Sequence, residues 1–302
     1  MNPYITPNRV RAALRSIDLR PTRGMGQNFL VDPDALDAIV AAAALTRDDT
    51  ALEVGPGLGV LTWELLQRAG RVVSVELDKR LVARLGQEFA GEPRLRIVQG
   101  DILRLPPEII FANHELASTN VPLQPSAFSL QPYKVVANLP YAITSPVLRH
   151  FLEAHHKPRV MVVLVQWEVA QRIVAAPGDL SVLAHSVQIY AAADIVARVP
   201  ATSFVPVPAV DSAVLRLRLY ERPAADVDDI DALFRVIKAG FLQPRKKLSN
   251  ALPGGLAAMG RAIERDAALA ALAAAGVSPD HRAEALTLAE WVAVYKQLTN
   301  SP

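Results

Sequence analysis

The stretch Ala51-Leu52-Glu53-Val54-Gly55-Pro56-Gly57-Leu58-Gly59 decides the fold of this chain. Its first four residues are apolar except for one glutamate, and they predict a buried strand. The glycines that follow predict the end of that strand and the tight start of a helix. The spacing of the leucines predicts that this helix continues to Ala69. A second strand is predicted at residues 72–76, so the region is typical of a βαβ unit in a parallel sheet.

The alternation of strands and helices continues along the chain. Strands are predicted at residues 95–98, 134–138 and 160–165, and helices at residues 81–89 and 145–152. Most of these strands are largely apolar, as expected for a parallel sheet that is covered on both faces. Residues 213–219 alternate apolar residues with arginines towards their end, which predicts a half-exposed antiparallel edge strand. We therefore expect an α/β fold, a Rossmann-like doubly wound sheet with an antiparallel strand late in the chain.

The chain changes character after Pro223. Residues 230–242, 256–277 and 284–298 carry helical patterns without strand signals and predict a small all-α domain, which an acidic segment precedes. We place the boundary between residues 220 and 221, so that residues 1–220 form the sheet domain and residues 221–302 the helical domain. Within the first domain, residues 106–133 are rich in proline, serine and asparagine and predict a surface insertion without regular structure.

Composition limits the classes of function. Of 302 residues, 51% are apolar and 21% are charged, which is enough to bury a full core and excludes general disorder. The absence of cysteine excludes disulfides, thiolate metal sites and cysteine nucleophiles, and it fits a cytoplasmic protein. The longest strictly apolar run, residues 267–275, is far shorter than the ~20 residues that a membrane span requires. The arginine-rich N-terminal segment lacks the apolar core of a secretory signal, and an organellar leader is the alternative.

The net charge of +2 is small, but basic residues are concentrated in two segments. Residues 1–30 contain five arginines and one aspartate, and residues 235–250 contain five basic residues and no acidic one. Such segments could neutralise the phosphates of a polyanion, which releases counterions. They are equally compatible with solvated faces of helices, and the charges alone leave both interpretations open.

Two carboxylates make the glycine-rich turn a candidate nucleotide site. Glu76 ends the second predicted strand, 21 residues after Gly55, where its carboxylate could accept hydrogen bonds from both hydroxyls of a ribose. Asp101 follows the third strand and adds an acceptor at the same edge of the sheet. The spacing G-x-G-x-G differs from the dinucleotide pattern and no phosphate-binding loop occurs, so an adenosine-bearing ligand without phosphate, such as S-adenosylmethionine, is favoured. A purely structural turn with ordinary strand-end carboxylates is the alternative.

Asn138-Leu139-Pro140-Tyr141 closes the fourth predicted strand and resembles the Asn-x-Pro-Tyr motif of methyltransferases that act on exocyclic amino groups. Four other segments occur with it in a fixed order: residues 26–30 (GQNFL), 53–57 (EVGPG), 204–212 (FVPVPAVDS) and 245–252 (RKKLSNAL). From about residue 10 to its C-terminus the chain resembles the KsgA/Dim family of ribosomal RNA adenine N6-dimethyltransferases. Residues 106–133 depart from the family pattern, because this connection is longer than usual.

The chemistry explains these residue types. The amino nitrogen of adenine is a weak nucleophile, because its lone pair is delocalised into the ring. If Oδ1 of Asn138 and the carbonyl of Leu139 accept its two hydrogens, the lone pair turns towards the methyl donor, and Pro140 would fix the turn that holds this carbonyl. Tyr141 would stack on the adenine, and Phe204 is the candidate for its other face, once the base has left its stack. No metal or strong base is required.

The resemblance implies that S-adenosylmethionine is bound by residues from the N-terminal segment and from the strand ends, namely Asn28, Leu30, Gly55, Gly57, Glu76, Asp101 and Asn138. Asn28, Leu30 and Gly55 would lie against the methionine part of the cofactor. Glu76 would hold the ribose, Asp101 the adenine amino group, and Asn138 both the cofactor and the target amine.

The resemblance also implies a substrate: two adjacent adenosines in a hairpin near the 3′ end of small-subunit ribosomal RNA, each dimethylated within an immature 30S particle in the cytoplasm. Basic residues would then dock RNA phosphates, namely Arg23, Arg235, Lys238, Arg245, Lys246 and Lys247. We expect a monomer that holds no metal and contacts no membrane.

Three alternatives stay open at this point. A resistance methylase of the Erm type acts on large-subunit RNA and shares most of these motifs, although residues 245–250 favour the small subunit. A non-catalytic assembly or transcription factor could keep the fold and bind RNA, but the intact residues 138–141 argue against it. A nicotinamide-dependent dehydrogenase is a more distant alternative.

Overall fold

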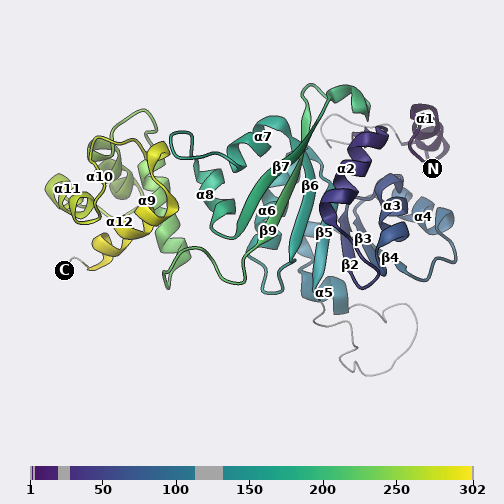
Figure 1. Cartoon of the computed structure of the whole chain (residues 1–302), viewed down its shortest axis with the longest axis horizontal. Helices are drawn as coiled ribbons and strands as arrows, with labels where there is room; N and C mark the ends of the chain where they lie inside the picture. The colour runs from purple at the N-terminus through teal and green to yellow at the C-terminus, as the bar shows by residue number, and fades with distance from the viewer. Residues whose placement is uncertain (1, 3, 20–27, 113–131, 301–302) are drawn as a thin grey trace. The chain divides into compact units, whose positions relative to one another are not determined.

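The computed structural model describes residues 2, 4–19, 28–112 and 132–300, and Figure 1 shows how the elements follow one another. The chain divides into two compact units. We call residues 1–170 together with 192–219 the sheet unit, and residues 171–191 together with 220–302 the helical unit.

Residues 171–191 group with the C-terminal helices, whereas the sequence-based division assigns them to the first domain. The backbone amides of Gly178 and Leu180 donate to the carbonyl oxygen of Glu284 at 2.9 and 3.2 Å. Helix α8 (Val182–Gln188) packs on α9 (Ile230–Phe241). The local pattern does not reveal this grouping, because it depends on contacts with residues far along the chain.

The strands that the structure describes in the sheet unit include one large sheet of order β4-β3-β2-β5-β6-β9-β7. Its members are β2 (Thr50–Val54), β3 (Arg71–Glu76), β4 (Leu95–Gln99), β5 (Tyr133–Asn138), β6 (Val160–Gln166), β7 (Ala191–Val199) and β9 (Ser212–Leu219). Strands β2 to β6 are parallel to their neighbours among them, and β9 is antiparallel to β6, with Gln166 opposite Ser212. The doubly wound α/β fold with a late antiparallel strand is confirmed.

Helices cover the sheet on both faces. The helices and short 3-10 turns of this part of the chain are α1 (Pro7–Ser16), α2 (Pro33–Ala43), α3 (Val60–Arg68), α4 (Lys79–Glu88), η2 (Ile102–Arg104), α5 (Pro107–Ala112), η3 (Tyr141–Ile143), α6 (Thr144–Leu152), α7 (Trp167–Ile173) and η4 (Ala201–Ser203). Helix α2 packs on β5, β6 and β9, α3 packs on β3, and α4 packs on β3 and β4. Every residue of β2 is buried, which requires cover on both sides. Across the described residues, each helix is too short or too polar to cross a membrane.

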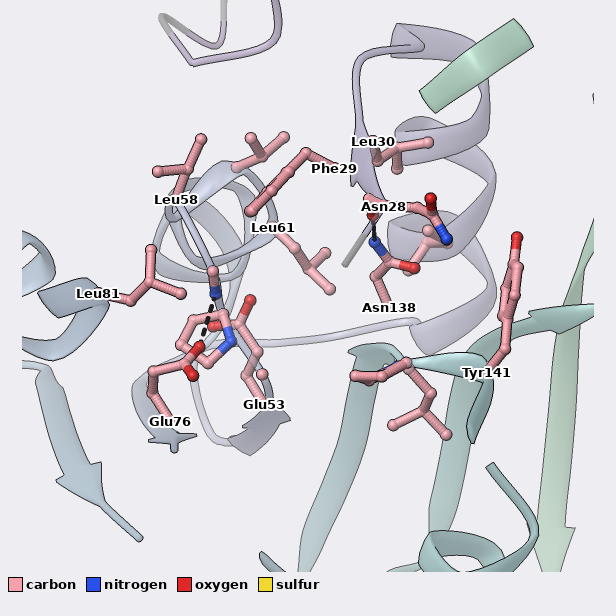
Figure 2. Close-up of a pocket in the computed structure, with 17 residues that line it drawn as sticks. Asn28, Phe29, Leu30, Glu53, Leu58, Leu61, Glu76, Leu81, Asn138 and Tyr141 are labelled. Carbon is pink, nitrogen blue, oxygen red and sulfur yellow. Dashed lines mark hydrogen bonds between the residues drawn. The ribbon is translucent and has the colours of Figure 1, made fainter. Parts of the chain in front are cut away.

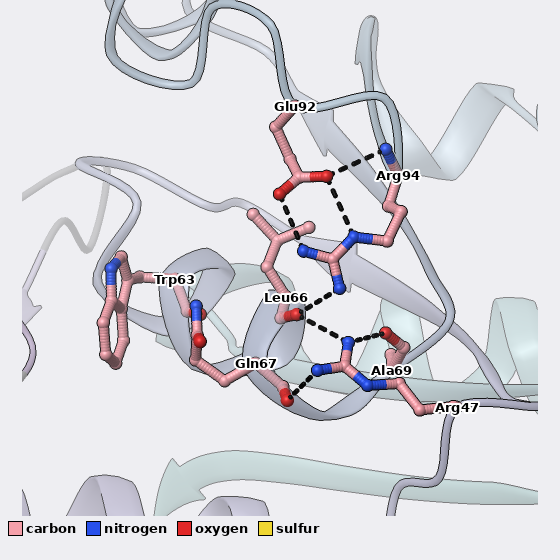
Figure 3. Close-up of polar contacts among 7 residues, drawn as sticks. All are labelled: Arg47, Trp63, Leu66, Gln67, Ala69, Glu92 and Arg94. Atoms are coloured by element: carbon pink, nitrogen blue, oxygen red, sulfur yellow. Dashed lines mark hydrogen bonds and ion pairs between the residues drawn. The ribbon is translucent and has the colours of Figure 1, made fainter.

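Helix α3 is anchored at its C-terminal end by two arginines from outside the helix (Figure 3). The last carbonyl groups of a helix lack partners within it, and Arg47 donates to three of these oxygens at 2.7–3.1 Å. Arg94 donates to the carbonyl of Leu66 at 2.9 Å and is held by the carboxylate of Glu92 at 2.8 and 2.9 Å. Cations are favourable at a helix C-terminus, so the two arginines stabilise this end of α3 and fix its position. The other end of α3 lies at the site described below.

Strand β9 is not an edge strand, so that prediction is wrong. Strand β7 lies outside it and forms the edge of the sheet. Arg216 and Arg218, whose alternation suggests solvent exposure, donate to the carboxylate of Asp194 on β7 at 2.9 and 2.7 Å. The arginine pattern therefore reflects cross-strand charge pairing, and β7 escapes prediction because its alanines have a weak preference for strands.

Part of the predicted insertion is helical. Residues 107–112 form α5, which begins at a proline and buries Ile110 and Phe111. The ring of Phe111 packs against that of Tyr133, with 4.7 Å between the ring centroids. The prediction that residues 106–133 lack regular structure is therefore wrong for this segment, and residues 113–131 lie outside the described part of the chain.

The helical unit contains α8, α9, α10 (Leu248–Ala258), α11 (Arg265–Ala274), η5 (Ala283–Ala285) and α12 (Leu288–Asn300). The all-α character of the C-terminal region is confirmed. The continuous helical pattern predicted at residues 256–277 is wrong, because α10 ends at Ala258 and Gly260 adopts a left-handed φ of +85°. The amide of Arg261 then donates back to the carbonyl of Leu256 at 2.9 Å, as at a glycine-terminated helix end.

The acidic segment before α9 is tied into the helical unit. The carboxylate of Asp229 accepts a hydrogen bond from the amide of Ala232 at 2.7 Å and so caps the N-terminus of α9. The carboxylate of Asp226 pairs with the ammonium group of Lys296 at 3.0 Å. Asp229 therefore caps a helix, and Asp226 ties the segment to α12, the helix that carries Lys296. The same segment also connects the two units along the chain.

An aromatic cluster in the core of the helical unit includes a buried histidine. The side chains of His185 and Trp291 are both fully buried. The ring of His185 lies 6.0 Å from that of Phe241 and 6.5 Å from that of Trp291. Neither ring nitrogen of His185 has a hydrogen-bond partner among the described residues. Burial lowers the pKa of His185 to about 4, so the ring is neutral at pH 7.

Candidate active site

The candidate site lies where the order of the strands reverses. From β2 the chain continues to β3 and β4 on one side, whereas β5 lies on the other side of β2. Open α/β sheets bind ligands at the carboxyl ends of their strands at such a point. A pocket with an empty volume of about 810 Å³, part of it open to solvent, is found there (Figure 2). Nine residues predicted from the sequence line it: Asn28, Leu30, Gly55, Gly57, Glu76, Asn138, Leu139, Pro140 and Tyr141.

The glycine-rich turn brings the start of α3 close against the pocket. Gly57 and Gly59 have φ angles of +57° and +84°, a region that other residues rarely adopt. A Cβ atom on Gly57 would lie 3.1 Å from Cε1 of Phe29, and one on Gly59 would lie 2.7 Å from Cε2 of Phe89. Both positions therefore favour glycine for backbone conformation, and at Gly59 a Cβ atom would also lack space.

Glu76 ends β3 and presents its carboxylate to the pocket as a rigid acceptor. Its Oε2 accepts a hydrogen bond from the amide of Gly57 at 3.1 Å, drawn in Figure 2. Its Oε1 accepts from the amides of Leu77 and Asp78 at 2.8 and 3.0 Å. Burial raises the pKa of Glu76, and the three amides oppose that shift. Oε2 keeps a lone pair for a further donor, such as a ligand hydroxyl.

Glu53 is a second carboxylate of the pocket, to which the sequence analysis assigns no role. Its side chain is only 1% exposed, and its Oε2 accepts hydrogen bonds from the hydroxyls of Thr62 and Ser74, both at 2.7 Å. Burial raises the pKa of Glu53 to about 7, although the two hydroxyls oppose the shift. The charge inside the pocket therefore changes close to neutral pH.

The pocket is anionic. Its lining, as far as the described residues define it, contains two glutamates and no lysine or arginine. Carboxylates accept hydrogen bonds from ligand hydroxyls and attract positive charge on a ligand, so the lining suits a ligand with both features.

Asn138 is the last residue of β5, and its side chain meets the N-terminal segment at the pocket (Figure 2). Its Nδ2 donates to the backbone carbonyl oxygen of Asn28 at 3.0 Å. An amide nitrogen only donates and an amide oxygen only accepts, so this bond sets the orientation of the group. Oδ1 is thereby left as the acceptor on the other side of the amide.

The segment that carries Asn28 is held by a strand pair that the sequence does not predict. Strand β1 (Phe29–Leu30) pairs antiparallel with β8 (Phe204–Val205). Next to this pair, the hydroxyl of Ser203 donates to the carboxylate of Asp32 at 2.5 Å. Asp32 followed by proline is a signal for the start of a helix, but nothing local reveals its distant partner.

Tyr141 lies at the rim of the pocket, at the start of η3 (Figure 2). Its ring is half-buried, and its hydroxyl oxygen lies 2.7 Å from Oγ of Ser212. Burial raises the pKa of Tyr141, so the phenol is uncharged at neutral pH. A neutral ring at the mouth of a pocket is suited to stacking on a flat ligand.

Two predicted site residues do not line the pocket. Phe204 is 1% exposed and belongs to the core, where it lies opposite Leu30 in the β1–β8 pair. The structure therefore does not bring its ring to a position where a base could stack on it, because the side chain is buried among core residues. Asp101 follows β4 and caps η2 by accepting from the amide of Leu103 at 3.0 Å. A cofactor role for Asp101 stays a prediction.

Of the residues predicted to dock RNA, Arg23 lies outside the described part of the chain. The other five are all exposed on α9 or between α9 and α10: Arg235, Lys238, Arg245, Lys246 and Lys247. Arg235 pairs with Asp229 at 3.5 Å, and Lys247 pairs with Asp280 at 2.8 Å. The remaining three form no ion pair with any described residue, so their charges face solvent.

Comparisons with known proteins agree with this geometry. The family model described as "Ribosomal RNA adenine dimethylase" matches residues 20–300. A protein of Dehalococcoides mccartyi strain BAV1, named "Ribosomal RNA small subunit methyltransferase A", is 43% identical over 94% of this chain and 90% of its own length. A protein of the same name from Moorella thermoacetica is 40% identical over 99% of both chains.

Two solved structures resemble the chain over most of its length. The 23S rRNA methyltransferase ErmE superimposes with a TM-score of 0.66 and 28% identity, covering 90% of this chain and 100% of that one. A dimethyladenosine transferase from Plasmodium falciparum superimposes with a TM-score of 0.67 and 22% identity, covering 88% and 95%, and it supports the fold. The family resemblance that the five ordered motifs carry is thereby confirmed. This chain belongs to the ribosomal RNA adenine dimethylase family and is, by that membership, a methyltransferase.

Proposed function

We propose that this methyltransferase converts two adjacent adenosines in the 3′-terminal hairpin of small-subunit ribosomal RNA to N6,N6-dimethyladenosine, with S-adenosylmethionine as the methyl donor. The observation that carries the proposal is the orientation of the Asn138 amide, whose nitrogen is bound to the carbonyl of Asn28 at 3.0 Å. This leaves the amide oxygen as an acceptor, which is what an amino group with two hydrogens requires.

Small-subunit RNA is favoured by the names and similarities of the relatives. Proteins named for the small subunit share 40% and 43% identity with this chain, whereas the solved 23S rRNA methyltransferase shares 28%. A large-subunit activity of the Erm type is therefore not favoured. The proposed particle is an immature 30S subunit in the cytoplasm.

The lining of the pocket fits S-adenosylmethionine. This cofactor supplies an electrophilic methyl group on a positively charged sulfur, and it carries no phosphate. Glu76, together with Glu53 when it is ionised, gives the pocket negative charge, and the described lining holds no basic side chain. Glu76, held by three backbone amides, would accept hydrogen bonds from the ribose, and Asn28, Leu30, Gly55 and Gly57 would line the rest of the cofactor.

Asn138 and Leu139 would act on the target nitrogen through hydrogen bonds. Oδ1 of Asn138 and the backbone carbonyl of Leu139 would accept the two amino hydrogens, which turns the lone pair of the nitrogen out of the ring system. The amide of Leu139 donates to the carbonyl of Leu164 at 3.3 Å, so the turn is tied to β6, and Pro140 restricts it further. Positioning of this kind replaces a metal or a strong base.

Each methylation would break the bond between the sulfonium sulfur and its methyl group, form an N–CH3 bond, leave a neutral thioether (S-adenosylhomocysteine) and release one proton of the amine to water. The monomethylated amine has a single hydrogen left, so the second methylation can use only one of the two acceptors. Asn138 is the candidate for this step, because the bond to Asn28 orients its side-chain oxygen as an acceptor.

The base would leave its stack to reach the pocket and lie on the ring of Tyr141. The exposed basic residues of the helical unit, above all Lys238, Arg245 and Lys246, would contact RNA phosphates. Such contacts supply affinity and register, whereas the flipped base and the shape of the RNA supply selectivity.

The proposal is tested by primer extension on ribosomal subunits that lack the modification, after incubation with the enzyme and S-adenosylmethionine. We expect strong stops at two adjacent adenosines near the 3′ end of the small-subunit RNA and none on large-subunit RNA. Modification confined to the large subunit would overturn the choice of substrate. If neither subunit is methylated, the proposed activity itself is overturned.

A further inference from the structure

Ser212 has a buried hydroxyl group that contacts Tyr141 at the rim of the pocket. Its side chain is fully buried, and its Oγ lies 2.7 Å from the phenolic oxygen of Tyr141, which is 71 positions away in the chain. The phenolic oxygen is the far end of the ring, so a hydrogen bond there restricts both torsions of the Tyr141 side chain.

Ser212 is itself held in place. It is the first residue of β9 and takes part in the β6–β9 pairing. The carboxylate of the preceding Asp211 accepts from the guanidinium of Arg198 at 3.0 Å and from the amide of Ala201 at 2.9 Å. The carbonyl of Asp211 accepts from the amide of Trp167 at 2.9 Å. The hydroxyl of Ser212 is therefore held in a fixed position, from which it can orient the ring of Tyr141.

We propose that Ser212 is a positioning residue for Tyr141, whose ring it holds in the orientation on which the target base stacks. Ser212 touches neither substrate nor cofactor in this role. The inference rests on the proposed function, because it takes the Tyr141 ring as the stacking surface for a flipped adenine. Stacking requires a defined ring plane, so a ring that rotates freely presents the productive surface for only part of the time.

The hydrogen bond can be removed from either end. Ser212→Ala and Tyr141→Phe each delete one hydroxyl and keep the backbone and the aromatic ring. Each is expected to lower kcat/KM for undermethylated small subunits about tenfold, the scale of one ordering hydrogen bond. The dissociation constant for S-adenosylmethionine is expected to stay within about twofold of the wild-type value, because the cofactor residues are unchanged. The double variant is expected to be no slower than the slower single variant, because both changes remove the same bond.

Ser186→Ala is the matched control. The hydroxyl of Ser186 donates to the carbonyl of Leu183 at 2.8 Å within the helical unit, and its loss is expected to leave kcat/KM unchanged. Ser212→Thr keeps a hydroxyl and is expected to recover most of the rate that Ser212→Ala loses. Tyr141→Phe leaves the core intact and tests the same bond even where Ser212→Ala folds poorly.

Three outcomes would overturn the positioning role. One is a wild-type kcat/KM in Ser212→Ala. Another is a double variant whose fold loss in kcat/KM equals the product of the two single losses. The third is a loss in Ser212→Ala that follows its folded fraction, with Tyr141→Phe unchanged. A wild-type enzyme that does not methylate small subunits at all would instead overturn the proposed function and would be seen before any variant is compared.

Discussion

The side-chain nitrogen of Asn138 lies 3.0 Å from the backbone carbonyl oxygen of Asn28, although 110 positions separate the two residues in the chain. This bond gives the amide a direction, with its donor end towards the N-terminal segment and its acceptor end available to a ligand. A carboxylate at position 138 could not donate to Asn28 and would place an anionic oxygen against a carbonyl oxygen. An amide at position 138 can form this hydrogen bond, whereas a carboxylate cannot.

We expect Asn138→Ala to lower methyl transfer to undermethylated small subunits at least about 100-fold, the scale for removing one group that acts at a reacting centre. Asn138→Asp, although similar in shape, is expected to be impaired as well because of the repulsion described above. Transfer of tritiated methyl groups at saturating cofactor measures both. Wild-type activity in Asn138→Asp would contradict the orientation of the amide.

Glu76→Gln is expected to weaken binding of S-adenosylmethionine about tenfold, which is ~1.4 kcal/mol. Glutamine replaces one acceptor oxygen by an NH2 group, which must then face a backbone amide of Gly57, Leu77 or Asp78. Isothermal titration calorimetry measures the affinity, and turnover at saturating cofactor is expected to change much less. An unchanged dissociation constant would show that Glu76 does not hold the cofactor.

The buried carboxyl of Glu53 makes stability depend on pH. Its pKa is about 7 in the folded chain against 4.5 for an exposed group, so between these values the folded state holds a proton that the unfolded state releases. The free energy of unfolding therefore falls as pH rises through this interval. Glu53→Gln keeps an acceptor for Thr62 and Ser74 but cannot ionise. As the pH rises from 4.5 to 8, we expect the free energy of unfolding of Glu53→Gln to increase relative to that of the wild type by on the order of 3 kcal/mol. Urea unfolding at both pH values measures this, and a difference independent of pH would contradict it.

His185 produces the opposite slope. Its pKa is about 4 in the folded chain against 6.5 when exposed, so in this interval the unfolded state binds a proton that the folded state does not. The free energy of unfolding therefore falls as pH drops below 6.5. We expect His185→Phe, which keeps a ring beside Phe241 and Trp291, to remove that acid sensitivity. Denaturant unfolding at pH 7.5 and pH 5 checks this, and equal acid sensitivity in both proteins would refute it.

Arg245→Ala tests RNA docking by the segment between α9 and α10. We expect weaker binding to small subunits and a salt dependence, d log K/d log[salt], that is smaller in magnitude by about 0.7–0.9, because one phosphate contact is lost. Arg265→Ala removes the same charge from another exposed position of the helical unit and is expected to change neither quantity. Equal effects of the two variants would mean that only net charge matters.

Local signals in the sequence are enough to predict which residues lie together at the centre of the candidate pocket. The turn at residues 55–59, Glu76 and residues 138–141 each end an apolar strand. Because the carboxyl ends of parallel strands meet at one edge of a sheet, their proximity follows from the fold class alone. The pocket that these residues line is the expected result.

The features that escaped prediction depend on partners far away in the chain. Phe204 looks like a free aromatic ring in its own segment, yet pairing with β1 places it in the core. Arg216 and Arg218 suggest a solvent-exposed edge until the carboxylate of Asp194 is placed beside them. The hydrogen bond between Ser212, at the start of β9, and Tyr141 likewise joins two segments that no local pattern connects.

The pairing of β1 with β8 also dictates an order of events during synthesis. Strands β2 to β6 are complete once residue 166 has left the ribosome, so the parallel part of the sheet can form early. The partner of Phe29 and Leu30 arrives only with residues 204 and 205. A nascent chain with a finished parallel sheet still lacks the strand that pairs with Phe29 and Leu30, so the segment after Asn28 is completed only once translation has passed residue 205.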